Sequence, residues 1–246
     1  MSGHSKWAQI KRQKGTLDVK KGATFTKLSN AISISVRDGG GVADESNFKL
    51  RLAIEKARSA NMPKENIQRA IDRGLGKGEK GDLEEVVYEG FGPGGFAVMI
   101  ECVTDNKLRT LGEITAVFNK NGGTLGQQGT VAYQFKQVGL LTLKKEGKSI
   151  DDVFLLAADA GADDIEDVGE EVLVYTEPGK LKATQTELKN QGLSIVEAEL
   201  FRKPTIFLPI GDKEAAGKAI SFVEKLEALD DVQKVYVNFE LSDELL

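Results

Sequence analysis

Apolar residues recur at helical spacing in three stretches near the start of the chain, at 25–36, 50–57 and 63–74. This period predicts three short amphipathic helices. Ser46 or Asn47 is suited to cap the second helix, because its side-chain oxygen can accept from a free backbone N–H. Small residues where the helices would cross favour a compact three-helix bundle.

A glycine-rich polar stretch at 74–81 separates this bundle from a different pattern and predicts a flexible boundary. Short apolar runs then alternate with helical periods. The expected elements are a hairpin, a helix capped by Asp105 and a further strand, at 86–91, 96–103, 108–118 and 131–135. The inner face of that helix is predicted to carry Leu108, Leu111, Ile114 and Phe118.

The next part of the chain has the order strand, helix, strand, strand, helix, strand. The ranges are 140–143, 153–160, 163–166, 171–175, 181–191 and 194–201. This order is typical of a ferredoxin-like module. A strand, a helix and a strand follow at 205–209, 215–229 and 232–239, too few elements to close a core by themselves.

The predicted fold class is therefore α+β, with an N-terminal three-helix bundle and basic arm, followed by two ferredoxin-like α/β modules, one inserted in the other. The basic helical domain spans 1–77. The discontinuous module combines 78–137 with 204–246, and the inserted module spans 138–203.

Charge is divided unevenly along the chain. Residues 1–77 carry 16 basic and 7 acidic side chains, whereas the remaining residues carry 17 basic and 31 acidic ones. The net charge of -5 hides this division. A cationic segment on an acidic body favours an anionic partner, most often a nucleic acid.

The first thirty residues hold seven of these cations and a single acid, Asp18, together with the chain's one His and one Trp, His4 and Trp7. Cations around an aromatic ring suit a surface that follows phosphates and stacks on a base. The alternative is a solvated helix with Trp7 packed on its own domain. The candidate nucleic-acid-binding residues are Lys6, Trp7, Lys11, Arg12, Lys14, Lys20, Lys21 and Lys27, with Lys64, Arg69 and Arg73 on the third helix.

The sequence offers little for catalysis or metal binding. Cys102 is the single cysteine, which excludes an internal disulfide, fits a reducing compartment and is interpreted as a small core residue. The glycines at 121–129 lack the Gly-Lys-Ser/Thr ending of a phosphate-binding loop. Acidic pairs such as Asp151-Asp152 are more typical of helix caps than of ion sites. We expect no enzymatic activity, no cofactor and no metal.

The longest apolar run, Phe96–Ile100, is far too short to span a membrane. The polar start of the chain does not resemble a secretory leader. The expectation is a cytoplasmic protein with no membrane partner.

Several short motifs spread along the chain are specific. They are Gly3-His4-Ser5-Lys6-Trp7, Phe25-Thr26-Lys27-Leu28, Asn61-Met62-Pro63-Lys64-Glu65-Asn66-Ile67, Tyr88-Glu89-Gly90-Phe91-Gly92-Pro93-Gly94-Gly95, Thr104-Asp105-Asn106 and Leu229-Asp230-Asp231-Val232-Gln233. With these motifs the sequence closely resembles the YebC/PmpR family, which includes the mitochondrial translational activator of cytochrome c oxidase subunit I. The resemblance runs from Ser2 to about Phe239.

The resemblance implies a three-domain gene-expression regulator, since family members are described as DNA-binding transcriptional regulators or as translation factors at the ribosome. The preferred hypothesis is a ribosome-associated translation factor that contacts ribosomal RNA and helps elongation through difficult sequences. The first alternative is a promoter-binding regulator that reads duplex DNA through Lys64, Asn66, Gln68, Arg69 and Arg73. The second is a protein-binding adaptor. The oligomeric state stays open.

Overall fold

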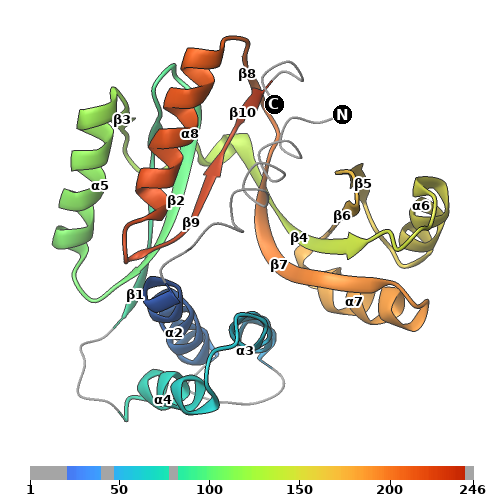
Figure 1. Ribbon diagram of the computed structural model, residues 1–246. Helices are drawn as coiled ribbons and strands as arrows, with labels where there is room; N and C mark the ends of the chain where they lie inside the picture. The colour runs from blue at the N-terminus through green and yellow to red at the C-terminus, as the bar shows by residue number, and fades with distance from the viewer. Residues whose placement is uncertain (1–20, 40–46, 78–82, 242–246) are drawn as a thin grey trace. The chain divides into compact units, whose positions relative to one another are not determined.

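The computed structural model describes residues 21–39, 47–77 and 83–241, which divide into two compact units (Figure 1). The first unit contains the described residues up to Tyr133 and the segment 211–237. The second unit contains 134–210 and the described residues from Asn238 onward. The chain therefore leaves the first unit after Tyr133 and returns to it at Gly211.

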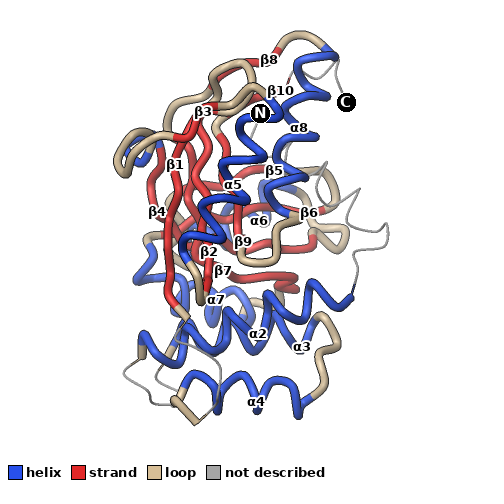
Figure 2. The backbone as a smooth tube through the Cα atoms, turned by 90° about the vertical axis from the view of Figure 1, so that its left-hand side faces the viewer, coloured by secondary structure: helices blue, strands red, loops and turns tan. Residues whose placement is uncertain are grey.

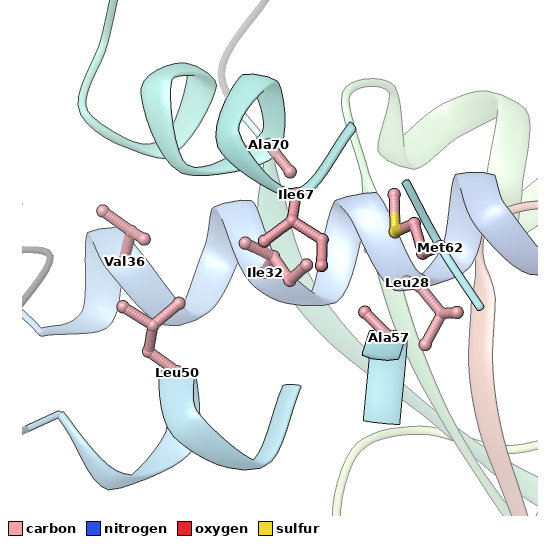
Figure 3. Close-up of a cluster of buried hydrophobic side chains, with 8 residues drawn as sticks. All are labelled: Leu28, Ile32, Val36, Leu50, Ala57, Met62, Ile67 and Ala70. Carbon is pink, nitrogen blue, oxygen red and sulfur yellow. The ribbon is translucent and has the colours of Figure 1, made fainter. Parts of the chain in front are cut away.

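The first unit begins with the three expected helices, α2 (Lys21–Asp38), α3 (Phe48–Ser59) and α4 (Lys64–Gly74). Asn47 caps α3, because its side-chain oxygen accepts from the N–H of Leu50 at 3.1 Å. The helices enclose an apolar core drawn in Figure 3, formed by Leu28, Ile32, Val36, Leu50, Ala57, Met62, Ile67 and Ala70. Burial of these side chains is the main force that holds three short helices together.

Helices α2 and α4 approach each other closely at Gly74. A Cβ atom added at Gly74 would lie 2.5 Å from the carbonyl oxygen of Ser33, which leaves no room for a side chain. One turn away, the Ser33 hydroxyl donates to the carbonyl of Ala70 at 2.7 Å. The small residues at this crossing therefore have a steric and a hydrogen-bonding function.

The rest of the first unit is a four-stranded sheet with two helices on one face (Figures 1 and 2). The strand order is β3-β1-β2-β9, with bounds Thr124–Leu125, Glu84–Phe91, Ala97–Thr104 and Val232–Val237. The covering helices are α5 (Lys107–Asn121) and α8 (Lys213–Glu227). Phe118 and Phe222 meet edge to face between sheet and helices, with ring centroids 5.0 Å apart.

Helix α2 also packs on this sheet, so the helices and the sheet form one unit. Ile34, on the side of α2 away from the bundle core, clusters with Leu83 and Val103. The Arg37 guanidinium donates to the carbonyl of Leu83 at 2.7 Å.

The second unit has the predicted ferredoxin-like element order. Its sheet order is β5-β6-β4-β7, with bounds Asp164–Asp167, Glu171–Thr176, Phe135–Lys144 and Ser194–Pro204. Helices α6 (Ile150–Asp159) and α7 (Leu181–Asn190) provide the helical layer, with a 3₁₀ turn η2 (Pro178–Lys180) before α7. A separate parallel pair, β8 (Leu208–Ile210) and β10 (Phe239–Leu241), completes this unit.

The strand predicted at 131–135 is wrong. Ala132–Gln134 form a 3₁₀ turn, η1, and the strand begins at Phe135 in the sheet of the second unit. The backbone N–H groups of Val131 and Ala132 bond to the carboxylate of Glu89 at 2.8 and 2.9 Å. They are therefore not available to a strand ladder.

The strand predicted at 205–209 also differs from the structure. It is reduced to β8, which pairs with β10 rather than with the sheet of the first unit. The short strand β3, which the sequence did not predict, takes the edge position beside β1.

The helix expected at 108–118 is present as α5, but it is rotated relative to the prediction. Its buried side chains are Thr110, Ile114 and Phe118, while Leu108 is 82% exposed. Asn106, and not Asp105, caps it by accepting from the N–H of Arg109. Thr110 turns inward because its hydroxyl is bonded to buried polar groups, a preference that apolar spacing does not reveal.

Candidate nucleic-acid interface

The arm residues of the predicted interface lie outside the described part of the chain. They are Lys6, Trp7, Lys11, Arg12, Lys14 and Lys20. Lys21 is the first residue of α2. The structure therefore places four of the predicted residues in detail, Lys27, Lys64, Arg69 and Arg73.

Two of these four cations hold the fold together. The Lys27 ammonium donates to the carbonyl of Glu227, at the last residue of α8, at 2.5 Å. The Arg73 guanidinium donates to the side-chain oxygen of Asn30 at 3.0 Å and so links α4 to α2. A cation at the C-terminal end of a helix is also favoured by the helix dipole. Both residues thus have structural contacts that basic composition alone did not reveal.

The other two cations, Lys64 and Arg69, lie on the exposed surface of α4 beside two acids, Glu65 and Asp72. The Arg69 guanidinium donates to the side-chain oxygen of Asn66. The Gln68 amide donates to Asp72 at 3.1 Å. Of the polar side chains that a DNA-recognition helix would aim at base edges, Asn66, Gln68 and Arg69 are therefore bonded within α4.

Helix α3 is more basic than α4, and sequence reasoning did not select it. Four cations stand in two pairs seven residues apart, Lys49 with Lys56 and Arg51 with Arg58. Residues at this spacing share one side of a helix. Lys49 is bonded to Asp38 at 2.7 Å, and the Arg51 guanidinium lies over the Phe48 ring at 5.6 Å. Lys56 and Arg58 are exposed, and the repeated spacing was the signal that could have identified them.

Taken together, segments 21–39 and 47–77 contain 11 basic and 4 acidic side chains. Exposed cations on a folded helical surface attract phosphates independently of base sequence. Lys56, Arg58 and Lys64 form the cationic set of this surface, because they flank the α3–α4 turn and all three are exposed. We refer to these three residues as the turn cations.

The motif residues near Asp231 form a buried polar network in the same unit. One carboxylate oxygen of Asp231 accepts from the Thr104 hydroxyl at 3.1 Å, the Thr110 hydroxyl at 2.7 Å and the Arg109 guanidinium at 2.7 Å. These donors come from the end of β2 and the first turn of α5, while Asp231 directly precedes β9. The network fixes three elements at one point.

The protonation of Asp231 follows from these contacts. Burial acts to raise the pKa of Asp231, but the hydrogen bonds from Arg109, Thr110 and Thr104 outweigh it and hold the pKa below its usual range. The carboxylate is thus charged at neutral pH, and one of its oxygens accepts three hydrogen bonds. This geometry is suited to holding the fold together rather than to proton transfer.

A second buried carboxylate, that of Glu89, forms hydrogen bonds with backbone N–H groups at the end of the glycine-rich loop at 121–129 and just after it. Glu89 is 3% exposed and accepts from the N–H groups of Gly129, Val131 and Ala132 at 2.8, 2.8 and 2.9 Å. Those amides therefore point at a protein carboxylate and not toward a phosphate site. The sequence predicted that this loop is not a phosphate-binding loop, but it did not identify Glu89.

Chemically reactive groups are sparse in the described ranges. Burial raises the pKa of the Cys102 thiol to about 12, so Cys102 is protonated and unreactive at neutral pH. Residues 21–39, 47–77 and 83–241 contain no group of three His, Cys, Asp or Glu side chains that could hold a metal ion. Within those ranges, every helix is too short or too polar to cross a lipid bilayer.

Comparison with known proteins gives matches along the whole chain. Residues 5–77 match the family model described as the TACO1/YebC protein N-terminal domain, and residues 83–239 match the one described as TACO1/YebC second and third domain. A probable transcriptional regulatory protein of Herpetosiphon aurantiacus is 50% identical over 246 residues, covering 100% of this chain and 97% of the relative. One of Chloroflexus aurantiacus is 49% identical, with 100% and 98% covered.

A solved structure agrees with this relationship. The crystal structure of a conserved hypothetical protein from Aquifex aeolicus superposes with a TM-score of 0.85 at 41% identity and covers 93% of this chain and 94% of that one. Sequence motifs, domain matches and fold all point to one group of regulatory proteins, and the chain belongs to the TACO1/YebC family.

Proposed function

We propose that this protein is a non-enzymatic, cytoplasmic gene-expression factor that binds ribosomal RNA through its basic helical surface and assists translation elongation. The observation that carries the proposal is the combination of exposed turn cations with the bonding of Asn66, Gln68 and Arg69 within α4. Such a surface supplies phosphate contacts but no array of free side chains for base edges. Ribosomal RNA is recognised largely through phosphates, shape and stacking, so this surface suits it.

The arm residues extend the same proposal. Lys6, Lys11, Arg12, Lys14, Lys20 and Lys21 add cations, and Trp7 adds a ring that can stack on a base. Lys64 and Arg69 contribute from α4, whereas Lys27 and Arg73 act by holding the helical surface in place.

The second candidate function is DNA-binding transcriptional regulation, and the names of the relatives favour it. Proteins 49–50% identical to this chain are called probable transcriptional regulatory proteins. This function requires that the affinity for one DNA sequence exceed that for random DNA by about a thousandfold or more. A basic surface alone gives a non-specific Kd of roughly 10⁻⁴–10⁻⁶ M at physiological salt. Weak DNA binding would therefore not support a regulator.

Co-sedimentation with ribosomes in a sucrose gradient at near-physiological salt tests the proposal. Wild type is compared with a charge reversal of the arm at Lys11, Arg12, Lys14, Lys20 and Lys21. We expect wild type to move with ribosomes and the reversal to stay at the top. If neither protein moves with ribosomes and one DNA sequence is bound about a thousandfold tighter than random DNA, transcriptional regulation replaces the proposal.

A further inference from the structure

Helix α6 of the second unit exposes two large apolar side chains. Phe154 is 56% exposed and Leu155 is 64% exposed. Ala158 is exposed as well and follows them by four and three positions. Residues at these spacings are neighbours on a helix surface, so Ala158 joins the other two into one apolar surface. We call Phe154, Leu155 and Ala158 the α6 face.

The packing of α6 on its own unit does not use the α6 face. Val153 and Ala157 are fully buried, at 0% exposure, and fix the helix beside α7 and β5 (Figure 1). Ser149 caps the start of the helix by accepting from the N–H of Asp152 at 3.1 Å. Single exposed apolar residues are ordinary on a protein surface, whereas contiguous ones mark interaction sites. The α6 face therefore has the composition of a contact surface.

The chain around the α6 face is strongly acidic. Residues 149–179 contain ten acidic side chains and no Lys, Arg or His. Two lysines from outside this stretch neutralise the acids of β5. Lys203 bridges Asp164 at 2.6 Å and Glu166 at 3.2 Å. Lys145 bridges Asp167 at 2.6 Å.

Three carboxylates beside the α6 face lack such ion pairs. Asp151 and Asp159 lie four positions before and after Leu155, on the same side of α6. Asp163 follows the turn that ends the helix. All three are exposed, and none forms an ion pair with another residue of 21–39, 47–77 or 83–241. The α6 face is therefore an apolar surface with an unneutralised negative border.

The charge of this border decides between possible partners. It repels the phosphates of RNA. A second copy of the chain, joined through the same face about a two-fold axis, would place the like charges of Asp151 and Asp159 opposite one another. A protein segment that carries Lys or Arg beside apolar side chains complements both the charge and the apolar surface.

We propose that the α6 face binds a basic amphipathic segment of another protein, and that this protein belongs to the ribosome. The assignment to the ribosome rests on the proposed function. Proteins that bind nucleic acids carry blocks of basic residues, so ribosomal proteins supply such segments beside RNA. The basic helices of the first unit then bind RNA, while the acidic α6 face binds protein.

Photo-crosslinking from the α6 face identifies what this face touches on the ribosome. Leu155→p-benzoylphenylalanine places a photoreactive ring on the exposed side of α6. After irradiation with purified ribosomes, we expect a cross-link to a ribosomal protein, in a peptide that has Lys or Arg beside apolar residues. Asp159→Lys in the same chain should lower the yield of this cross-link by about threefold or more. Glu187→Lys makes the same change of charge on the exposed surface of α7 and should leave the yield unchanged.

Other cross-linking results would overturn the proposal. A product with ribosomal RNA would assign the face to RNA binding. A product between two copies of the chain would assign it to self-association. Co-sedimentation with ribosomes without any cross-link from position 155 would also contradict the docking.

A peptide titration tests the docking without ribosomes. The probe is a fluorescently labelled amphipathic peptide of lysine and leucine, and we expect wild type to raise its anisotropy. F154Q/L155Q should weaken this binding by about tenfold. L108Q/L111Q removes two exposed leucines from α5 in the first unit and should bind as wild type does. Equal affinity for all three proteins would overturn the docking.

The two experiments separate the docking from the proposed function. If wild type does not move with ribosomes but binds the peptide through Phe154 and Leu155, the assignment to the ribosome fails with the proposed function, and the docking site stands. If wild type moves with ribosomes but the α6 face contacts neither a ribosomal protein nor the peptide, the docking fails and the proposed function stands.

Discussion

The first unit uses charge in two different ways, and its sheet and its helices show the contrast. In the sheet, Asp231 and Glu89 are 7% and 3% exposed, and each accepts three hydrogen bonds. Around the α3–α4 turn, Lys56, Arg58 and Lys64 are exposed. Buried charges are costly unless fully bonded, whereas exposed ones contribute little to folding. The difference teaches that the first set maintains the fold, whereas the second set lies on the exposed helical surface.

The largest effect on stability is expected from Asp231→Ala. The substitution leaves the hydroxyls of Thr104 and Thr110 and the Arg109 guanidinium without their shared acceptor. We expect a loss of about 3 kcal/mol in the free energy of unfolding, measured by urea titration. RNA binding of the fraction that remains folded should match wild type. A stability loss below about 0.5 kcal/mol, the range of ordinary surface substitutions, would contradict a structural role for this network.

The same carboxylate predicts a dependence of stability on pH. The pKa of Asp231 is lowered in the folded state, so its contribution is present above the unfolded pKa and is lost as pH falls through the folded value. Acidification below about pH 4, the ordinary range of Asp, should therefore destabilise wild type more than Asp231→Asn. Parallel stability curves for the two proteins would contradict this assignment.

Glu89→Gln should have the next largest effect. One amide oxygen can accept in place of the carboxylate, but the amide nitrogen then faces a backbone N–H. We expect a loss of about 1–3 kcal/mol, together with faster hydrogen exchange at Gly129, Val131 and Ala132. Unchanged exchange at these amides would show that Glu89 does not hold the loop.

A smaller effect on stability is expected at Gly74, where α2 and α4 pack closely against each other. Gly74→Ala places a Cβ atom against the Ser33 carbonyl oxygen and should destabilise by about 1–3 kcal/mol. Gly112→Ala is the matched control, because Gly112 lies within α5 with open space around it and should gain about 1 kcal/mol. Thermal unfolding of both variants gives the comparison. The same sign for both would show that the α2–α4 crossing is not tightly packed.

Cys102 should show no reaction in the folded protein. Because burial raises its pKa to about 12, a thiol reagent such as DTNB should not modify it at pH 8 until denaturant is added. Rapid modification of the native protein would place this residue at an accessible surface.

Sequence pattern predicted the parts of the fold that depend on local periodicity. The helices α2, α3 and α4 and the element order of the second unit follow directly from apolar spacing. The errors at 131–135 and in the face of α5 have another cause, since hydrogen bonds from distant residues decide both. Glu89 takes the amides after the glycine loop, and Asp231 turns Thr110 inward.

The sequence predicted that the candidate interface is cationic, but it did not predict which residues form it. The excess of cations in residues 1–77 identified the region. Composition does not show that Lys27 is bonded to the end of α8 or that Arg73 is bonded to Asn30, because those partners are brought close by folding. Composition also did not distinguish Lys56 and Arg58 from other surface cations. The seven-residue spacing of cations along α3 could have identified them.

The most direct test of the central claim is the salt dependence of ribosomal RNA affinity for wild type, K56E/R58E/K64E and the control K182E/K189E. The control reverses exposed lysines on α7 in the second unit. We expect the turn-cation variant to keep its unfolding free energy within about 0.5 kcal/mol. Its log–log salt slope should be shallower than that of wild type by about 2–3, while the control keeps the wild-type slope. Equal slopes for all three proteins would contradict the claim that the exposed cations of the helical surface bind RNA.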